Sequence, residues 1–444
     1  MGLCAHIFRR DLRIEDNTSL IYCLKNYKKV LPIFILDKNI LKLRDKTNSF
    51  SFMIDCLIDL NQNLNSKSSK LYLFYDYPEN VIKKLIDIGV ETISVNRDYT
   101  PYSKSRDEKI RQICIKNNVK FFQHPDLLLN EPEDVVKDDG KPYTIFFHFL
   151  RKSKKLKVKY PEKNNFQNYF NENIGEIEIS FLNKFKGHTA IKGGRQNAIQ
   201  LLKKSKYIKY KETRNFASKE TTKLSPHNRF GTVSIREVYY TFKENGDEQL
   251  INELYWRDFF IHIGYHFPHV FKSSFKEKYR NIKWNDDKQK FKLWCEGKTG
   301  FPIVDAGMRE LNQTGFMHNR VRMITSSFLV KVLGINWRLG ERYFASKLID
   351  YDPSVNNGNW QWIASTGCDS QPFFRVFNPW LQQRKFDPNC IYIKKWIPEL
   401  FKYSSQQIHS IENNHLNDKN YPNPIVDYKD SVKKTLKIFK QNLP

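Results

Sequence analysis

Short apolar runs alternate with longer amphipathic stretches along the first 125 residues. The apolar runs are typical of strands buried on both faces, because a parallel sheet covered by helices has near-continuous hydrophobic segments. They occupy residues 4–8, 30–36, 70–75, 90–96 and 119–123. The amphipathic stretches predict helices over 46–64, 79–88 and 102–117. This alternation predicts a doubly wound (Rossmann-like) parallel sheet with right-handed crossovers.

The pattern changes after this region. Residues 126–195 are rich in charge and Asn and include the basic run 152–159, which indicates a long connection between domains. Beyond about residue 196, helical spacing dominates, with Gly, Pro and Asn as stops. We therefore predict an α/β domain over 1–128, an interdomain linker over 129–195 and an all-helical domain over 196–444.

The α/β half contains no glycine-rich nucleotide motif. No GxGxxG follows the first strand, and the GKT at 297–299 has Lys292 where a P-loop needs its first Gly. A doubly wound sheet can still hold a ligand where its strand order reverses, but the sequence does not identify one.

Composition adds a strong basic charge. Lys and Arg number 74 against 48 Asp and Glu, a formal net charge of +26. Hydrophobic content of 40% with 14% aromatic residues excludes a disordered chain. The charge favours a nucleic-acid partner, although an AT-rich genome that enriches Lys codons would produce the same excess.

The cysteines and the first residues of the chain indicate the compartment in which we expect the protein. The seven cysteines are odd in number, scattered and without a CxxC pair, which favours free thiols in a reducing compartment. The start, MGLCAHIFRRDLR, reaches Arg after a short apolar run, and no stretch approaches the ~20 apolar residues of a membrane span. We expect a soluble intracellular protein of the cytoplasm and nucleoid, or of the nucleus in a eukaryote, with no membrane association.

One aromatic and polar cluster lies in the segment 251–260. Glu253, Trp256, Arg257 and Phe260 recur at i, i+3, i+4 and i+7, so they share one helix face. Charged groups on such a face are costly to bury without partners. An amphipathic helix with a solvated polar edge would give the same pattern.

Two further clusters follow. In the segment 315–330, Asn319, Arg322 and Met323 share a helix face. The segment 348–365 collects carboxylates, an amide and indoles at Asp350, Asp352, Asn356, Trp360 and Trp362. Asp352 before Pro353 is a helix-start signature. Taken one at a time, these residues are ordinary helix caps and core aromatics.

Together, six blocks resemble the photolyase/cryptochrome flavoproteins. The blocks are FRRDLRIEDN (8–17), TTKLSPHNRFG (221–231), NELYWRDFF (252–260), GFPIVDAGMRELNQTGFMHNRVRM (300–323), NWRLGERYF (336–344) and NNGNWQWIASTGCDSQPFFRVFNP (356–379). The resemblance runs from residue 4 to about 400 and is greatest to class I cyclobutane pyrimidine dimer (CPD) photolyases. It implies a carbon–carbon lyase that splits these dimers in DNA by light-driven electron transfer from reduced FAD, with return of the electron.

The resemblance implies FAD in the helical domain, active as the reduced anion. Matches to the family's phosphate and ribityl contacts are Tyr210, Thr221, Thr222, Lys223, Leu224 and Ser225. Matches around the flavin ring are Arg257, Arg322, Asp350, Asp352 and Asn356, with Asn356 at the position facing N5. The chain departs from the family at Lys223 (usually Arg), Phe316 (usually Trp) and Leu250 (usually aromatic).

The resemblance also implies a lesion cavity beside the flavin adenine. Glu253 matches the carboxyl group that hydrogen-bonds the dimer, and Trp256 and Trp362 match its aromatic walls. Asn319 and Met323 match further lesion contacts, and Arg214 matches a DNA-side contact. Glu253, Asn319 and Trp362 would border the cofactor too, and the catalytic residues would be Glu253, Asn319 and Asn356. A damaged, poorly stacked dinucleotide costs less to extrude from the duplex than intact bases.

Trp284, Trp337 and Trp360 match the family's electron-relay triad, although the ordinary interpretation of any one of them is a core tryptophan. The resemblance further implies a second, antenna chromophore, for which we expect a folate. The partner would be UV-damaged DNA, with no obligate protein partner and a monomeric enzyme. The histidines His262, His266 and His269 lack an HExxH pattern, and we expect no metal.

The alternative function is a cryptochrome-type blue-light photoreceptor, which binds the same flavin but signals. Asn356 argues against it, because plant cryptochromes carry Asp there and animal ones Cys. The retained lesion set and the short segment after Leu400 argue against it too.

Overall fold

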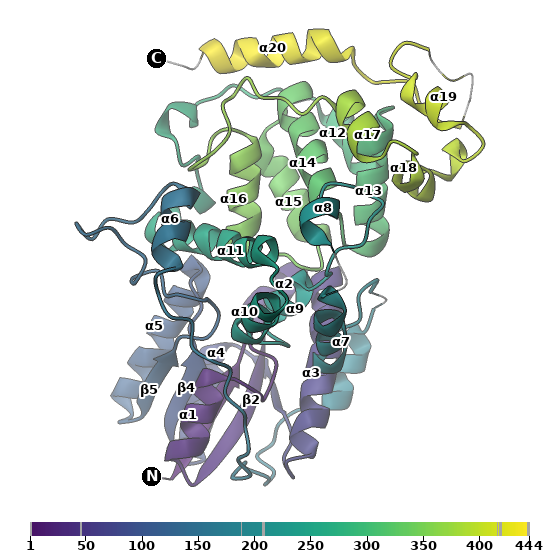
Figure 1. Cartoon of the computed structure of the whole chain (residues 1–444). Helices are drawn as coiled ribbons and strands as arrows, with labels where there is room; N and C mark the ends of the chain where they lie inside the picture. Colours follow the sequence, from purple (N-terminus) through teal and green to yellow (C-terminus); the bar gives the residue numbers. More distant parts are fainter. Residues whose placement is uncertain are drawn as a thin grey trace. The chain divides into compact units, whose positions relative to one another are not determined.

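A computed structural model describes residues 2–44, 47–187, 189–206, 209–414, 416 and 420–441. Figure 1 labels its α-helices and several of its strands. Backbone contacts divide the chain into two compact units. The first comprises Met1–Tyr143, Phe147–Tyr207 and Thr222–His266, and the second Thr144–Phe146, Ile208–Thr221 and Phe267–Pro444.

The first unit contains a five-stranded parallel sheet in the order β3-β2-β1-β4-β5. The strands are β1 (Leu3–Phe8), β2 (Lys29–Asp37), β3 (Tyr72–Asp76), β4 (Val90–Asn96) and β5 (Lys120–His124). All lie where the apolar runs predicted them. The strand order reverses between β1 and β4, so the predicted doubly wound sheet is confirmed.

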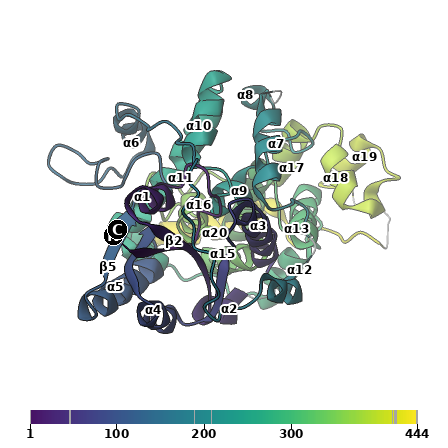
Figure 2. The same cartoon turned by 90° about the horizontal axis from the view of Figure 1, so that it is seen from below.

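Helices cover both faces of this sheet. They are α1 (Thr18–Asn26), α2 (Lys38–Arg44), α3 (Asn48–Asn65), α4 (Pro78–Asp87) and α5 (Pro101–Lys116). α4 and α5 contact each other, and Figure 2 shows α1 and α4 on opposite sides of the strands. The pattern did not predict α1 and α2. Most of α1 is buried, so it lacks the polar face that marks an amphipathic helix.

The segment predicted as a linker is ordered against the sheet. It contains α6 (Phe146–Ser153) and the 3₁₀ helix η1 (Ile179–Phe185). The backbone N–H of Phe170 donates to Val30 O, and that of Ile177 to Leu73 O, both at 2.8 Å. The connection therefore runs along β2 and β3.

Four helices after the linker belong to the first unit by their contacts: α7 (Arg195–Ser205), α9 (Ser225–Phe230), α10 (Ile235–Glu244) and α11 (Glu248–His266). Gly231 ends α9 in left-handed conformation, and a Cβ there would lie 2.1 Å from Arg10 O. This close approach lets α9 dock where β1 ends. The contact division therefore differs from the domain boundaries expected at 128 and 195, which stay predictions.

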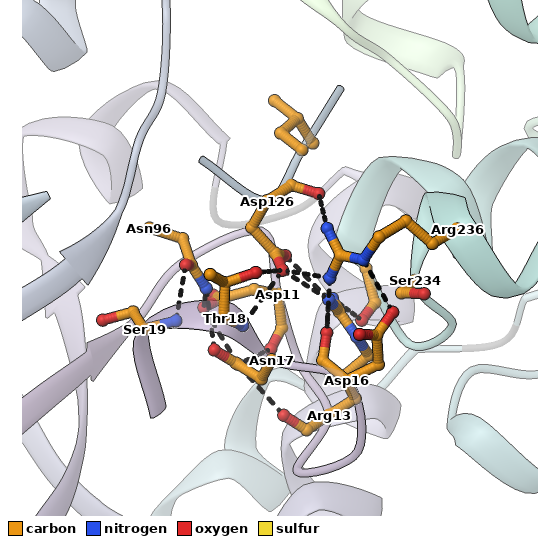
Figure 3. Close-up of polar contacts among 12 residues, drawn as sticks. Asp11, Arg13, Asp16, Asn17, Thr18, Ser19, Asn96, Asp126, Ser234 and Arg236 are labelled. Carbon is orange, nitrogen blue, oxygen red and sulfur yellow. Dashed lines mark hydrogen bonds and ion pairs between the residues drawn. The ribbon is translucent and has the colours of Figure 1, made fainter. Parts of the chain in front are cut away.

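A buried ionic network attaches α10 to the sheet (Figure 3). Asp126 accepts from Arg13 at 2.7 and 2.8 Å and from Arg236 at 2.8 Å, while Arg236 Nε donates to Asp16 at 2.9 Å. Burial would raise the pKa of Asp126, but Arg13 and Arg236 outweigh it and hold that pKa well below its usual range. Asp126 is therefore ionised at neutral pH.

Among its described residues, the second unit's longer regular elements are helices, joined by irregular segments. Its helices are α8 (Tyr210–Thr213), η2 (Pro268–Phe271), η3 (Glu277–Tyr279), α12 (Lys288–Glu296), α13 (Pro302–Thr314), α14 (Asn319–Ser327), the π-helix η4 (Phe328–Val332), α15 (Trp337–Lys347), α16 (Pro353–Ile363), α17 (Pro379–Phe386), α18 (Ile391–Trp396), η5 (Pro398–Leu400), α19 (Ser405–His409) and α20 (Tyr428–Gln441). An apolar core contributed by α12–α16 lies at its centre. The predicted class, an α/β domain joined to an all-helical part, is confirmed. Among the described residues, no helix is long and apolar enough to cross a bilayer.

Candidate functional site

α14 presents the predicted polar face. Asn319, Arg322 and Met323 are exposed or half-buried, while Val321 and Ile324 on the other side are fully buried. The helix therefore has one face in the core and one open face that carries an amide, a guanidinium and a thioether.

Arg322 makes a two-point ion pair with Asp350. Its Nη1 and Nη2 donate to the two carboxylate oxygens at 3.2 and 2.9 Å, and its Nε donates to Met317 O at 2.8 Å. The guanidinium also lies 5.6 Å from the ring centre of Phe316. Paired arginine–carboxylate hydrogen bonds fix geometry as well as charge, so this pair connects α14 rigidly to the start of α16.

The start of α16 is built by Asp352, whose carboxylate accepts from the backbone N–H of Ser354 and Val355 at 2.9 and 3.0 Å. One turn later, Asn356 Nδ2 donates to Glu341 Oε1 at 2.8 Å. That contact fixes the amide orientation. Glu341 was not foreseen, because nothing in the sequence relates it to Asn356.

The three relay candidates share one apolar cluster. Trp337 and Trp360 are fully buried in it, and Trp284 packs against it partly exposed. A Cβ at Gly340 would lie 2.2 Å from Trp360 Cη2, so glycine lets the Trp360 indole lie against α15. Burial of two tryptophans and partial exposure of the third suits an inside-to-surface relay, which stays a prediction.

Sequence reasoning missed a further tryptophan. Trp294 is fully buried, its Nε1 donates to Thr325 O at 3.1 Å, and its ring centre lies 6.2 Å from that of Trp360. Trp294 lies outside the six blocks that carry the family resemblance, so nothing in the sequence marked it, and its burial is seen only in the structure.

In the first unit, α11 places Glu253, Trp256 and Arg257 on its half-buried side, as predicted. Gln249 Nε2 donates to Glu253 Oε1 at 2.8 Å. Trp256 stacks on Phe260 with ring centres 5.6 Å apart, which restricts the indole. The face therefore offers an oriented carboxylate beside a restrained aromatic surface.

Arg257 is held between α11 and the segment after β5. Its guanidinium donates to Leu127 O at 2.9 Å and pairs with Asp258 at 3.0 Å. Burial raises the pKa of Asp258 to about 7, against the opposing effect of Arg257. The predicted ring-side contact of Arg257 stays a prediction.

The predicted phosphate loop spans the division between the units. Thr222–Ser225 lie in the first unit and end in α9, while Thr221, Tyr210 and Arg214 lie in the second. Lys223 has a φ of 52°, which is uncommon for a residue other than glycine. The chain therefore turns sharply at Lys223, just before α9.

Polar groups beside these elements fit a flavin nucleotide. Asn228 Oδ1, on α9, and Asn252 Oδ1, next to Glu253, are buried acceptors with no hydrogen-bond partner among the described residues. Ribose or ribityl hydroxyls would satisfy such acceptors. With the Arg322–Asp350 pair and Asn356, the chain carries both donors and acceptors for FAD.

The histidines of α11 serve packing. His262 is buried against Phe149, its ring centre lies 4.5 Å from that of His266, and burial lowers its pKa to about 3. The described residues contain no group of three or more His, Cys, Asp or Glu arranged to hold a metal.

A second polar site lies in the first unit, where the strand order reverses. Arg9 and Arg10 follow β1, and Asp98 follows β4, with Arg10 3.4 Å from Asp98. Arg106 Nη2 is buried with no partner in the described part of the chain. A neighbouring cavity of about 300 Å³ is lined by Arg97, Asp98, Lys104, Asp107, Glu108, Arg111, Phe121, Gln123 and Tyr265. This is the edge at which doubly wound sheets bind ligands.

The class that the fold and the two sites define is a flavoprotein with an α/β half and a helical half. Residues 4–165 match the family model "DNA photolyase", and residues 250–441 match "FAD binding domain of DNA photolyase". The chain belongs to the photolyase/cryptochrome family.

Relatives match nearly the whole chain. A protein of Alkalihalophilus pseudofirmus named deoxyribodipyrimidine photo-lyase is 36% identical over 98% of this chain and 97% of its own. The archaeal photolyase from Sulfolobus tokodaii, solved with two FAD molecules, is 43% identical, with a TM-score of 0.92 over 99% of this chain and 100% of its own. A Synechocystis cryptochrome is 27% identical, with a TM-score of 0.90 over 99% of each chain.

Proposed function

We propose that this chain is a light-driven deoxyribodipyrimidine photo-lyase that splits cyclobutane pyrimidine dimers in DNA with FAD as its chromophore. The observation that carries the proposal is the Arg322–Asp350 pair, which joins the open face of α14 to the start of α16. The same helical unit contains Asn319, Arg322, Asp350, Asp352 and Asn356, for which the resemblance implies contacts with the cofactor.

When bound, reduced FAD would supply the light-driven transfer of an electron to the dimer and its return. The protein's part is to hold and orient. Arg322 and Asp350 present a fixed pair of opposite charges, and Asp352 and Asn356 present oxygens and an amide along the first turn of α16. Thr222 and Ser225 contribute hydroxyls near the start of α9, where backbone N–H groups can meet a pyrophosphate.

The lesion contacts that the resemblance implies are part of this proposal. Trp256 and Trp362 replace part of the stacking that an extruded dimer loses. Glu253 hydrogen-bonds a pyrimidine of the dimer and stabilises the additional charge while the electron resides there. Asn319 and Met323 add an amide and a soft apolar contact from α14. These groups act by stacking and hydrogen bonding. The proposed reaction requires no acid–base step, so none of them needs to gain or lose a proton.

Duplex binding would rest on charge. A chain of net charge +26 displaces counterions from DNA, so its affinity falls as salt rises. Phosphate contacts, including Arg214, would set position along the duplex, and the extruded dimer would supply specificity. We further propose that the enzyme acts as a monomer in the compartment that holds DNA.

The test is repair of an oligonucleotide with a single thymine dimer, followed by chromatography, in light and in the dark. We expect loss of the dimer only in the light and only with reduced FAD bound. FAD binding without any light-dependent loss would contradict the proposal and favour the cryptochrome alternative. A protein that does not retain FAD would contradict both.

We also propose that the sheet holds a second chromophore with an anionic group at the edge where the strand order reverses, after β1 and β4. Arg9, Arg10 and Arg106 converge there, and the unpartnered Nη2 of Arg106 would find an acceptor in such a group. The second FAD of the Sulfolobus tokodaii photolyase supports a flavin over the folate expected from sequence. Chromatography of the pigments released from purified protein would distinguish flavin, folate and none, and Arg106→Ala should lower only the second pigment.

A further inference from the structure

The residues 332–334 form a turn in the second unit that two separate segments bind. Ser431 and Thr435 of α20 donate hydroxyl hydrogen bonds to its first carbonyl at 2.8 and 3.3 Å. Asn285, directly after Trp284, donates its backbone N–H to Gly334 O at 2.8 Å and its Nδ2 to Leu333 O at 3.1 Å. One turn therefore fixes both the C-terminal helix and the segment that carries Trp284.

α20 places Phe439 against that tryptophan. Phe439 is fully buried, and its ring centre lies 5.6 Å from that of Trp284 at an interplanar angle of 83°. It also stacks on Phe373 at 6.0 Å with 13° between the planes, and meets Tyr279 edge-on at 6.0 Å. Trp284 is partly exposed, so Phe439 covers one part of an indole whose remainder is open to water.

Lys331 holds the Phe439 ring from the π-helix. Its Nζ lies 4.2 Å from the ring centre and donates to Ser365 Oγ at 2.7 Å and to Phe373 O at 3.0 Å. The lysine is fully buried. An amine with two fixed acceptors and an aromatic face leaves Phe439 little freedom to move.

We propose that Phe439 is a positioning residue for Trp284, through which docking of α20 controls how readily water and soluble reductants reach the outer tryptophan. The proposal rests on the electron relay of the proposed function. One electron leaves Trp284 for the inner tryptophans, and its indole N–H proton then passes to water. A soluble one-electron donor such as ascorbate returns the electron, and water returns the proton. Covering the indole slows these exchanges without touching the dimer site.

The first measurement needs no light-driven activity. Acrylamide quenching is compared between the full-length FAD-loaded protein and its Trp284→Phe variant, and the difference isolates Trp284 among the eight tryptophans. The same comparison, with and without Trp284→Phe, is then repeated in proteins that carry Phe439→Leu or Phe439→Ala. Phe439→Leu keeps an apolar side chain that can dock α20. We expect the quenching constant of Trp284 to rise about two- to tenfold, the factor that an edge-to-face aromatic pair contributes to an equilibrium. Lys437→Ala, on the exposed side of α20, is the matched control and should leave it unchanged.

The second measurement follows the tryptophan radical by transient absorption after a flash, with increasing ascorbate. In Phe439→Leu the radical should decay faster with ascorbate by a similar factor, while dimer repair with chemically reduced flavin stays at the parent level. Unchanged quenching and unchanged decay in both Phe439 variants would overturn the proposal. A parent protein that forms no tryptophan radical would overturn the relay and the proposal together, whereas light-dependent repair would still stand.

Discussion

A buried arginine–aspartate network in the first unit and a partly exposed arginine–aspartate pair in the second differ in how far their groups are exposed to solvent. In the first unit, Arg236 is 9% exposed and bonds Asp16 and Asp126, and Asp126 also holds Arg13. In the second unit, Arg322 is 24% exposed and bonds a single carboxylate, Asp350. The first pair lies inside a closed network. The second lies at the edge of an open helix face.

The difference separates structural charge from functional charge. A buried network resists substitution, and burial keeps its charged groups away from a ligand. A partly exposed pair with fixed geometry can add a ligand without rearrangement, because its orientation is already set. Residue type alone does not distinguish the two, since both are Arg and Asp.

The largest expected effect comes from breaking the closed network. Asp126→Ala leaves Arg13 and Arg236 buried without their shared carboxylate, which should lower the free energy of unfolding by about 3–5 kcal/mol. Denaturant unfolding followed by circular dichroism measures it. Lys25→Ala, in an exposed pair with Glu162, is the control and should cost less than about 1 kcal/mol. Equal losses in both variants would show that the network contributes no more than a surface pair.

The same network gives a pH dependence. The pKa of Asp126 is lower in the folded chain than in the unfolded one, so its contribution is complete above the unfolded pKa of about 3.9 and is lost as pH falls below it. Unfolding free energy measured from pH 6 downward should decrease less steeply in Asp126→Ala than in the parent.

Lys331 sharpens the comparison, because its hydrogen-bond partners Ser365 and Phe373 are neutral. Burial, with a smaller effect from Lys276, lowers its pKa to about 7. Between pH 7 and the unfolded pKa of about 10.4 the unfolded chain binds more protons, so stability should rise with pH. Lys331→Met should remove that rise, which we expect to be about 3–5 kcal/mol because each pKa unit corresponds to about 1.4 kcal/mol. Parallel stability–pH curves for the two proteins would contradict the assignment.

The sequence predicted the sheet well because each buried strand is a continuous apolar run, and β4 begins and ends where expected. It could not predict the ionic network, whose members Arg236 and Asp126 lie 110 residues apart in the chain. Pairing over that separation depends on the tertiary fold, and composition does not indicate it.

The site shows the same limit. The faces of α11 and α14 followed from helical spacing, and the role of each residue came from the resemblance. Glu341, Trp294 and Phe439 were missed, since each contributes through a contact with another element. A residue whose role lies in touching Asn356, Trp360 or Trp284 carries no local signal.

Breaking the partly exposed Arg322–Asp350 pair should lower FAD affinity more than it lowers the stability of the fold. Asp350→Asn keeps the shape and removes the charge, which should weaken FAD binding by about 1.5–3 kcal/mol. Titration of the apoprotein with FAD, followed by flavin fluorescence, measures this loss. The exposed pair Arg384–Glu412 provides a control, and Glu412→Gln should leave FAD affinity unchanged. Normal FAD affinity in Asp350→Asn would place this pair with the structural charges.

The smallest effect on stability, and none on repair, is expected for Trp337→Phe. A smaller aromatic at this buried position should cost less than about 1.5 kcal/mol. Photoreduction of oxidised flavin should stop, while repair with chemically reduced flavin continues. Loss of repair under both conditions would show that Trp337 only supports the core.

Repair per absorbed photon in Glu253→Ala tests the central claim, that this chain splits dimers at the face of α11, most directly. Under the proposed function, the variant loses a hydrogen bond to the dimer that matters most while the dimer carries its extra charge, worth about 1.5–3 kcal/mol for a charged partner. Ground-state DNA binding depends mainly on phosphate contacts and should change little. We predict a clear fall in repair per photon, with FAD content and the salt dependence of DNA affinity unchanged. Repair at the parent's efficiency would contradict the account.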